Sequence, residues 1–474
     1  MLGIGLLLLA IGLFLTYRYY YPLLIFFGFV TNGYQMIPVD LLLAGGPASK
    51  LTDLALIFLL VALVSRSRVL FLSMRQEKTF RWLGLFIIFI IIDGIYSIVS
   101  EGYEIGGVLS VFRSNLFLLS FGLFFIVPAP ILKQIFHIIA IITVIQSAIF
   151  LLQIPLNQTL LNSTMAGSAV STTNLDKFTR FYNTPVFLTP VLFYYLFQFR
   201  CRSLTIHGFV LFILLAAVIA PLHRNYVFGI IVVSSLYVIF QQKRTQRVLY
   251  LTASAVIIFG FSMLDIVSQR ANGGFSDFSK TFTTGQSLAT TDYGENTFAY
   301  RMAHLFERIN YVSAKPGGYV FGIGLLSEDT KQANKLSFEV GAYDERIGRV
   351  SQINTGDIAW SLLILQLGFA GTSLFVIVLV QFARLFYRYR SEPFGPVGLL
   401  SLMTTFLISF AGTELLMIPF RTLLVFLAVI AIKAAHRPPV RVTPVSLDLD
   451  KIPRHPGKEV AVSAIADRHI EQQA

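Results

Sequence analysis

The chain has 474 residues, of which 55% are hydrophobic and only 13% are charged, and its mean hydropathy is +0.71. Such a composition has too few polar residues to cover the surface of several soluble domains, so it indicates a membrane protein that is surrounded by lipid. Cys201 is the single cysteine, which excludes disulfides within the chain. The net charge of +12 fits the Lys and Arg excess of cytoplasmic loops, and we favour this explanation over nucleic-acid binding.

Continuous apolar runs along the chain predict membrane spans, each of about 20 residues. The runs lie at 2–16, 21–34, 52–65, 82–99, 107–127, 133–153, 185–199, 207–222, 225–241, 248–266, 357–380, 395–412 and 414–434. The first two are short and can also be one broken hairpin, so we expect about 12 to 14 spans. No basic residues precede the first run, so it is interpreted as a span and not as a cleavable signal peptide.

Basic residues gather in connections that lie an even number of spans apart. They are Arg66, Arg68, Arg75, Lys78 and Arg81, then Arg200 and Arg202, then Lys243, Arg244 and Arg247, then Arg384, Arg388 and Arg390, and finally Lys433, Arg437 and Arg441. The positive-inside rule places all of these connections in the cytoplasm. The sequence therefore predicts an all-α polytopic transmembrane bundle. Its parts are an N-terminal bundle (1–266), a large periplasmic loop (267–356), C-terminal transmembrane helices (357–434) and a cytoplasmic tail (435–474).

The large loop contains a helix-like run at 298–312 with three basic side chains on one stripe. Arg301, His304 and Arg308 follow one another at i, i+3 and i+7, which is the spacing of one helical face. The planar fork of arginine suits bidentate contact with phosphate. The alternative is the solvated face of an ordinary amphipathic helix.

Glycines follow this helix in the segment 317–324, which includes Gly322 and Gly324. They do not form a dinucleotide fingerprint, because no strand–helix unit of the required length surrounds them. By themselves they predict a tight turn.

Asp357 stands at the junction of the loop with a long apolar run that contains Gly368 and Gly371. A carboxylate at this junction can act on a substrate at the membrane surface. It can equally cap the N-terminus of the helix that follows.

Two further arginines lie where spans begin on the outer side. Arg224 separates two apolar runs with almost no loop, and Arg180 precedes the span that begins near Pro185. Ionisable groups at such depth are costly and usually functional, although a snorkelling arginine is the alternative. The other ionisable residues in or near spans are Asp93, Arg113, Glu414 and Arg421.

Taken together, these residues resemble the bacterial O-antigen ligase and polymerase superfamily. In order, that family shows an arginine before an Asn-Pro-like turn, an arginine opening a span, a loop helix led by arginine with a proline and a Gly-x-Gly turn, and a polar residue ahead of paired glycines. The similar positions here are Arg180 with Asn183-Thr184-Pro185, Arg224, Arg301 with Pro316 and Gly322-Ile323-Gly324, and Asp357 with Gly368 and Gly371. The detailed match covers residues 170–375.

The resemblance implies a glycosyltransferase of the bacterial cytoplasmic (inner) membrane, with its active site facing the periplasm and polyprenyl-pyrophosphate-linked glycans as substrates. Arg180, Arg224, Arg301 and Arg308 would bind the pyrophosphate, and Asp357 or His304 would be the catalytic base. Neither a metal nor another cofactor is expected. Ligases of the family carry histidine followed by asparagine where this chain has Asp357-Ile358, which favours a repeat-unit polymerase.

Two alternatives remain open at this stage. One is an O-antigen ligase that transfers glycan to a lipid or protein acceptor, and the other is a lipid-linked oligosaccharide flippase or other transporter. Transporters commonly carry charges near the bilayer midplane in repeated halves, whereas this chain has no detectable repeat and concentrates its charges beside one loop. A chain-length regulator and a flippase are the expected protein partners, the lipid bilayer is the expected surroundings, and nucleic acid is not expected.

Overall fold

The computed structural model describes most of the chain as far as His436. The described residues are 2–44, 50–163, 172–175, 178–221, 223–241, 297–341, 343–344, 349–353 and 358–436. Those before His436 belong to one compact unit. The predicted span at 248–266, most of the predicted tail at 435–474 and Asp357 lie outside the described residues.

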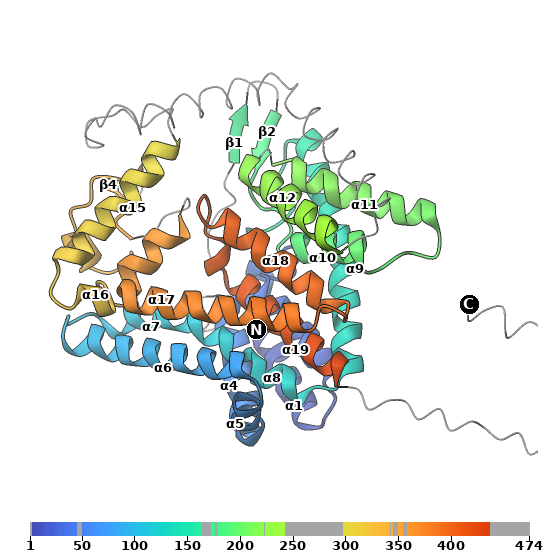
Figure 1. Cartoon of the computed structure of the whole chain (residues 1–474), viewed down its shortest axis with the longest axis horizontal. Helices are drawn as coiled ribbons and strands as arrows, with labels where there is room; N and C mark the ends of the chain where they lie inside the picture. The colour runs from blue at the N-terminus through green and yellow to red at the C-terminus, as the bar shows by residue number, and fades with distance from the viewer. Residues whose placement is uncertain are drawn as a thin grey trace, which may run out of the picture. The chain divides into compact units, whose positions relative to one another are not determined.

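Helices dominate the described structure (Figure 1). The first group is α1 (Leu2–Leu15), α2 (Tyr20–Val30), α3 (Val39–Leu43), α4 (Leu51–Ser65), α5 (Ser67–Gln76), α6 (Lys78–Val99), α7 (Ile105–Leu116), η1 (Phe117–Leu119), α8 (Ser120–Ile126) and α9 (Ala129–Leu156). The second group is α10 (Leu188–Phe197), α11 (Leu204–Ile219), α12 (Arg224–Gln241), α15 (Thr297–Ala314), α16 (Gly318–Phe321), η3 (Ala333–Lys335), α17 (Ala359–Arg388), α18 (Phe394–Ile408), η4 (Glu414–Leu416) and α19 (Ile418–Ala435).

Strands are confined to two small antiparallel ribbons in the described residues. One pairs β1 (Thr172–Leu175) with β2 (Phe178–Phe181), and the other pairs β3 (Tyr343–Asp344) with β4 (Arg349–Val350). Both lie in segments that the sequence predicts as connections between spans, so they do not alter the helical class of the fold.

Five segments in the described part of the chain are long and apolar enough to cross a membrane. They are Lys78–Val99, Ile105–Ile126, Ala129–Leu156, Ala359–Arg388 and Ile418–Ala435. Shorter apolar helices are Leu2–Leu15, Tyr20–Val30, Leu51–Ser65, Leu188–Phe197, Leu204–Ile219, Asn225–Ile239 and Phe394–Ile408. Every predicted apolar run within the described residues thus coincides with a helix. The prediction of an all-α polytopic membrane protein is confirmed.

The structure adds detail at the N-terminal end. The first two runs form separate helices, α1 and α2, which pack against each other. Tyr17, with a φ of 64°, lies in the short turn between them. The basic connection after α4 also contains a helix, α5, where the sequence predicts only a loop.

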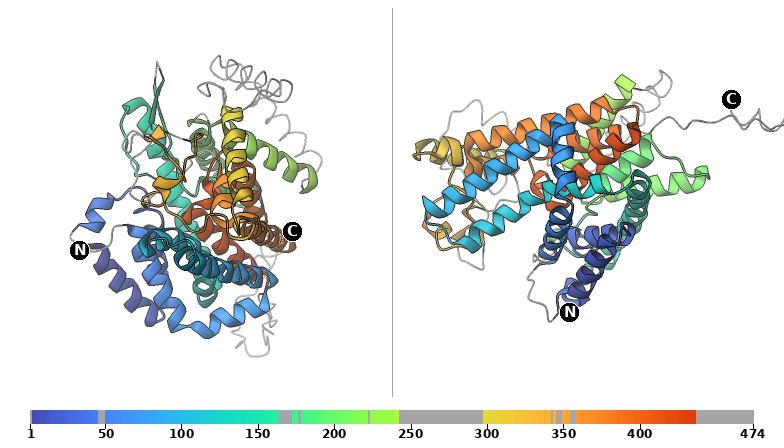
Figure 2. Two further views of the ribbon diagram at one scale, coloured as in Figure 1. Left: turned by 90° about the vertical axis from the view of Figure 1, so that its left-hand side faces the viewer. Right: turned by 90° about the horizontal axis from the view of Figure 1, so that it is seen from below.

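Helices α6 and α17 run side by side along most of their length (Figures 1 and 2). Because lipid tails are as apolar as the helices, such pairs depend on close packing more than on exclusion of water. Gly371 of α17 has no side chain, which leaves room for the ring of Phe89 of α6. The rings of Phe86 and Phe375 also meet across the pair, with centroids 5.3 Å apart.

Hydrogen bonds sort the helix ends into two groups. On what we call the basic side, Tyr389 donates to Glu77 at 3.0 Å, and Lys433 donates to the Phe125 carbonyl oxygen at 2.7 Å. On the opposite side, called the loop side, the Leu325 amide donates to Ser97 Oγ at 2.8 Å. Each bond joins ends that the basic connections assign to the same side.

Candidate functional site

The segment that begins with α15 folds back onto the loop-side ends of the membrane helices. The Ile323 amide donates to the Leu365 carbonyl oxygen of α17 at 2.7 Å. The Tyr103 hydroxyl, just before α7, donates to the Ile323 carbonyl oxygen at 2.8 Å. An ion pair of 2.8 Å joins Lys315 to Glu101, which follows α6. Residues of this segment are therefore held against the membrane bundle.

The glycine-rich turn fits into a kink of α17. Gly322 and Gly368 have φ values of 61° and 62°, in the left-handed region that favours glycine. A methyl group on Gly322 would lie 2.7 Å from the Gly368 nitrogen and closer still to the Leu365 carbonyl oxygen. The predicted turn and the predicted glycine pair, more than forty residues apart in sequence, thus form one backbone contact.

Gly324 makes a second close approach in the same turn. Its φ is 88°, and an added side chain would collide with Ser97 of α6. The two glycines of the predicted loop turn therefore position the segment after α15, and their amides donate to the Gly318 and Phe321 carbonyl oxygens.

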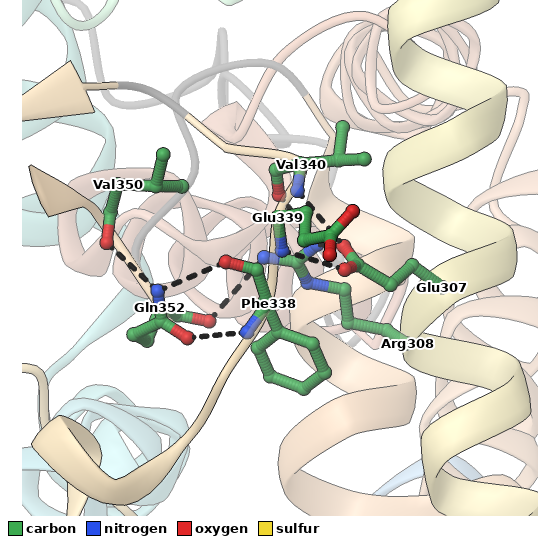
Figure 3. Close-up of polar contacts among 7 residues, drawn as sticks. All are labelled: Glu307, Arg308, Phe338, Glu339, Val340, Val350 and Gln352. Atoms are coloured by element: carbon green, nitrogen blue, oxygen red, sulfur yellow. Dashed lines mark hydrogen bonds and ion pairs between the residues drawn. The ribbon is translucent and has the colours of Figure 1, made fainter. Parts of the chain in front are cut away.

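Arg308 of α15 is fully buried and bonded to protein atoms (Figure 3). Its Nη1 pairs with Glu307 and donates to the Val340 carbonyl oxygen at 2.5 Å, and its Nη2 donates to the Gln352 carbonyl oxygen at 3.4 Å. The guanidinium also lies 4.2 Å from the ring centroid of Phe338. Burial lowers the pKa of Arg308 to about 10, so the group stays charged at neutral pH. These contacts fit a structural role better than the predicted role in binding pyrophosphate.

Two side chains that the sequence did not single out complete this network (Figure 3). Glu307 accepts hydrogen bonds from the amides of Glu339 and Val340, at 2.7 and 3.2 Å. Gln352 accepts from the Phe338 amide at 2.7 Å and donates to the Phe338 carbonyl oxygen at 3.2 Å. Nothing in their sequence neighbourhood signals these contacts, because the partners lie in separate loop segments.

His304 lies one turn before Arg308 on the same helix and is 1% exposed. Within the described residues, neither ring nitrogen has a hydrogen-bond partner. Burial, followed by the nearby positive charge of Arg308, lowers the pKa of His304 to about 3. A neutral, enclosed imidazole of such low basicity is poorly suited to deprotonate a sugar hydroxyl.

Arg180 of β2 is brought to the turn that precedes Arg224. Its Nε donates to the Pro221 carbonyl oxygen, and its guanidinium lies 4.4 Å from the ring centroid of Tyr182. Arg224 is the first residue of α12, and its side chain is outside the described structure. The structure therefore brings Arg180 close to the start of α12, although the two arginines are more than forty residues apart in sequence.

A buried amide network explains the Asn183-Thr184-Pro185 turn that follows Arg180. Asn183 and Gln153 exchange hydrogen bonds of 3.1 Å through their amide groups. Gln35 donates to the Thr184 carbonyl oxygen at 3.2 Å and accepts from the Val186 amide at 3.0 Å. Because buried amides need partners, this network fixes the path of the chain between β2 and α10.

Arg301 is half-buried on α15, one turn before His304. Asp357, the other predicted catalytic residue, lies outside the described residues. The helix that follows it begins at Ala359, with Ile358 in the N-cap position. The Ala359 amide donates to the carbonyl oxygens of Ser409 and Gly412, at 3.2 and 3.1 Å. Asp357 itself is not described, so its interpretations as a base and as a helix cap both stay predictions.

The remaining ionisable residues differ in their partners. Arg113 forms an ion pair of 2.6 Å with Asp53, whereas the fully buried Asp93 has no hydrogen-bond partner for its carboxylate oxygens among the described residues. Within the same residues, no three His, Cys, Asp or Glu side chains gather as a metal site would require.

In comparisons with known proteins, no protein-family model matches the sequence, and no curated protein matches it.

Proposed function

We propose that this protein is a membrane glycosyltransferase that polymerises polyprenyl-pyrophosphate-linked repeat units on the periplasmic side of a bacterial cytoplasmic membrane. The observation that carries the proposal is the return of the Arg301-bearing segment to the loop-side ends of α6 and α17. An arginine on a loop helix and an arginine at a span boundary can share one substrate only when the loop folds back in this way. The approach of Arg180 to the α11–α12 turn supports the same grouping.

The reaction requires two kinds of group. An acceptor hydroxyl gives its proton to a base while its oxygen attacks the anomeric carbon of the donor sugar. The bond from that carbon to the pyrophosphate breaks, and polyprenyl pyrophosphate leaves with the electron pair. Preorganised arginines stabilise the charge that develops on the leaving group. We assign this role to Arg180, Arg224 and Arg301. Arg308 is assigned a structural role in the loop.

Asp357 is the base in this proposal. Its rival His304 is enclosed, and its pKa is lowered to about 3. Asp357 is followed within two residues by α17, so it belongs to the junction between loop and membrane. The carboxylate in place of the histidine expected for a ligase favours polymerisation over transfer to a different acceptor.

The side of the membrane is part of the proposal. The hydrogen bonds among helix ends agree with the parity of the basic connections, which supports a periplasmic loop at 267–356 and a cytoplasmic tail. Alkaline phosphatase fused near Asn334 should be active, and the same enzyme fused near Gly457 inactive. The reverse pattern would place every assigned residue on the wrong side.

Reconstitution into liposomes with a purified lipid-linked repeat unit tests the activity. Products carrying several repeats on one polyprenyl pyrophosphate, seen by mass spectrometry, are the expected result. Arg301→Lys keeps the charge but loses the bidentate fork, so it should reduce turnover strongly at unchanged protein level. Arg388→Lys, on the basic side, is the matched control and should remain active. Full activity of Arg301→Lys and of Arg224→Lys would contradict the assigned roles.

A further inference from the structure

A polar cavity of about 280 Å³ opens on the loop side, and neither Arg180 nor Arg301 is among the residues that line it. It lies among α7, α17, α19 and the segment that follows the glycine-rich turn. Its lining residues with polar side chains are Lys50, Ser110, Ser114, Asn115, Ser327, Asp329, Gln366 and Arg421. Leucines of α17 and η4, Leu326 of the segment after the glycine-rich turn, and a valine of α7 make up the rest of the wall.

Arg421 is the notable member of this lining. It is 4% exposed, and its Nη1 donates to Asn115 Oδ1 at 2.8 Å. In the described part of the chain, its Nε has no acceptor and no carboxylate lies within ion-pair distance of its guanidinium. Glu414, its neighbour at the same span end, is therefore not its counterion. A buried cation without a counterion is costly, and in a membrane protein it is usually functional.

The remaining lining fits an anion with several oxygens. Lys50, which is half-buried, adds a second positive charge, and three serine hydroxyls can donate hydrogen bonds. Asp329 adds a carboxylate, which offsets one of the two charges and can accept a bond from a hydroxyl of the ligand. The volume lies just below the range of about 300–1,000 Å³ that is typical of ligand sites, so a headgroup fits and a long glycan does not.

We propose that this cavity binds a phosphate or pyrophosphate group, with Arg421 as its main ligand and Lys50 at its edge. Arginine is the side chain best suited to such oxyanions because of its planar fork of donors. Asn115 holds the guanidinium in place from the neighbouring helix. The site goes beyond the proposed function, whose pyrophosphate-binding arginines belong to β2, α12 and α15.

The test uses the full-length protein in detergent, with binding of inorganic pyrophosphate followed by calorimetry. All titrations use the Arg301→Gln background, which weakens the proposed transfer site, and the cavity variants are compared with one another within that background. Arg421→Gln should weaken binding by roughly ten- to a hundredfold, and Lys50→Gln by a smaller factor. Arg388→Gln, which removes an arginine that is 61% exposed on the basic side, should leave affinity unchanged. If Arg421→Gln does not fold, the loss of affinity in Lys50→Gln decides the question.

Native mass spectrometry separates the sources of the phosphate group. The protein is placed in nanodiscs of phosphatidylglycerol, with or without added polyprenyl pyrophosphate. The protein with Arg421 intact should retain one of the two lipids, and the Arg421→Gln variant should lose it. Binding of inorganic pyrophosphate without retention of either lipid would support a site for free phosphate. Equal affinity of the parent protein and both cavity variants for every probe would overturn the proposal.

Discussion

Replacing Arg308 by methionine should destabilise the loop segments that Arg308 bonds to α15. In the proposed function Arg308 does not contact the substrate. Methionine matches the length of the arginine stem but removes the bonds to the Val340 and Gln352 carbonyl oxygens and the ion pair with Glu307. Removing one partner of a buried ion pair costs about 3–5 kcal/mol. Because Glu307 is 25% exposed and keeps two backbone donors, we expect the lower end, about 3 kcal/mol.

Hydrogen exchange of the backbone amides measures this loss locally. The amides of Glu339 and Val340 depend on Glu307, so their exchange should become roughly a hundredfold faster in Arg308→Met, as about 3 kcal/mol requires. The control is Arg388→Met, whose ion pair with Glu77 involves a side chain that is 61% exposed. Such a pair contributes about 0–1 kcal/mol, so exchange near it should hardly change. Unchanged protection at residues 339–340 together with lost transferase activity would refute the structural role and return Arg308 to the substrate site.

Three further predictions concern other residues. Gly322→Ala should destabilise the fold markedly more than Gly102→Ala: both glycines have positive φ, but only Gly322 faces backbone atoms, and thermal unfolding in detergent compares them. The lowered pKa of His304 means that stability is complete above pH 6.5 and falls by up to about 1.4 kcal/mol per pH unit between 6.5 and 3, a slope that His304→Phe should remove in unfolding measured against pH. Asp357→Asn should lose orders of magnitude in polymerisation rate with folding intact, whereas His304→Gln should be mild; the opposite outcome would exchange their roles.

The sequence by itself determined the class of the fold and the positions of its helices. Apolar runs are a local property of the chain, and in lipid every backbone group must be bonded within its own segment, so each run becomes a helix. The glycines at 317–324 likewise predicted a tight turn from local geometry alone. These inferences needed no knowledge of which segments meet.

Only the tertiary structure decided what surrounds the candidate residues. Arg301, His304 and Arg308 look equivalent on a helical stripe, yet Arg308 is enclosed by the loop segments that carry Val340 and Gln352, and His304 is desolvated, because neighbours from distant segments cover that face of α15. The contact of Gly322 with Gly368 and the cavity around Arg421 likewise depend on segments far apart in sequence. Burial and the absence of a counterion are properties of packing, and the spacing of residues along the chain does not contain them.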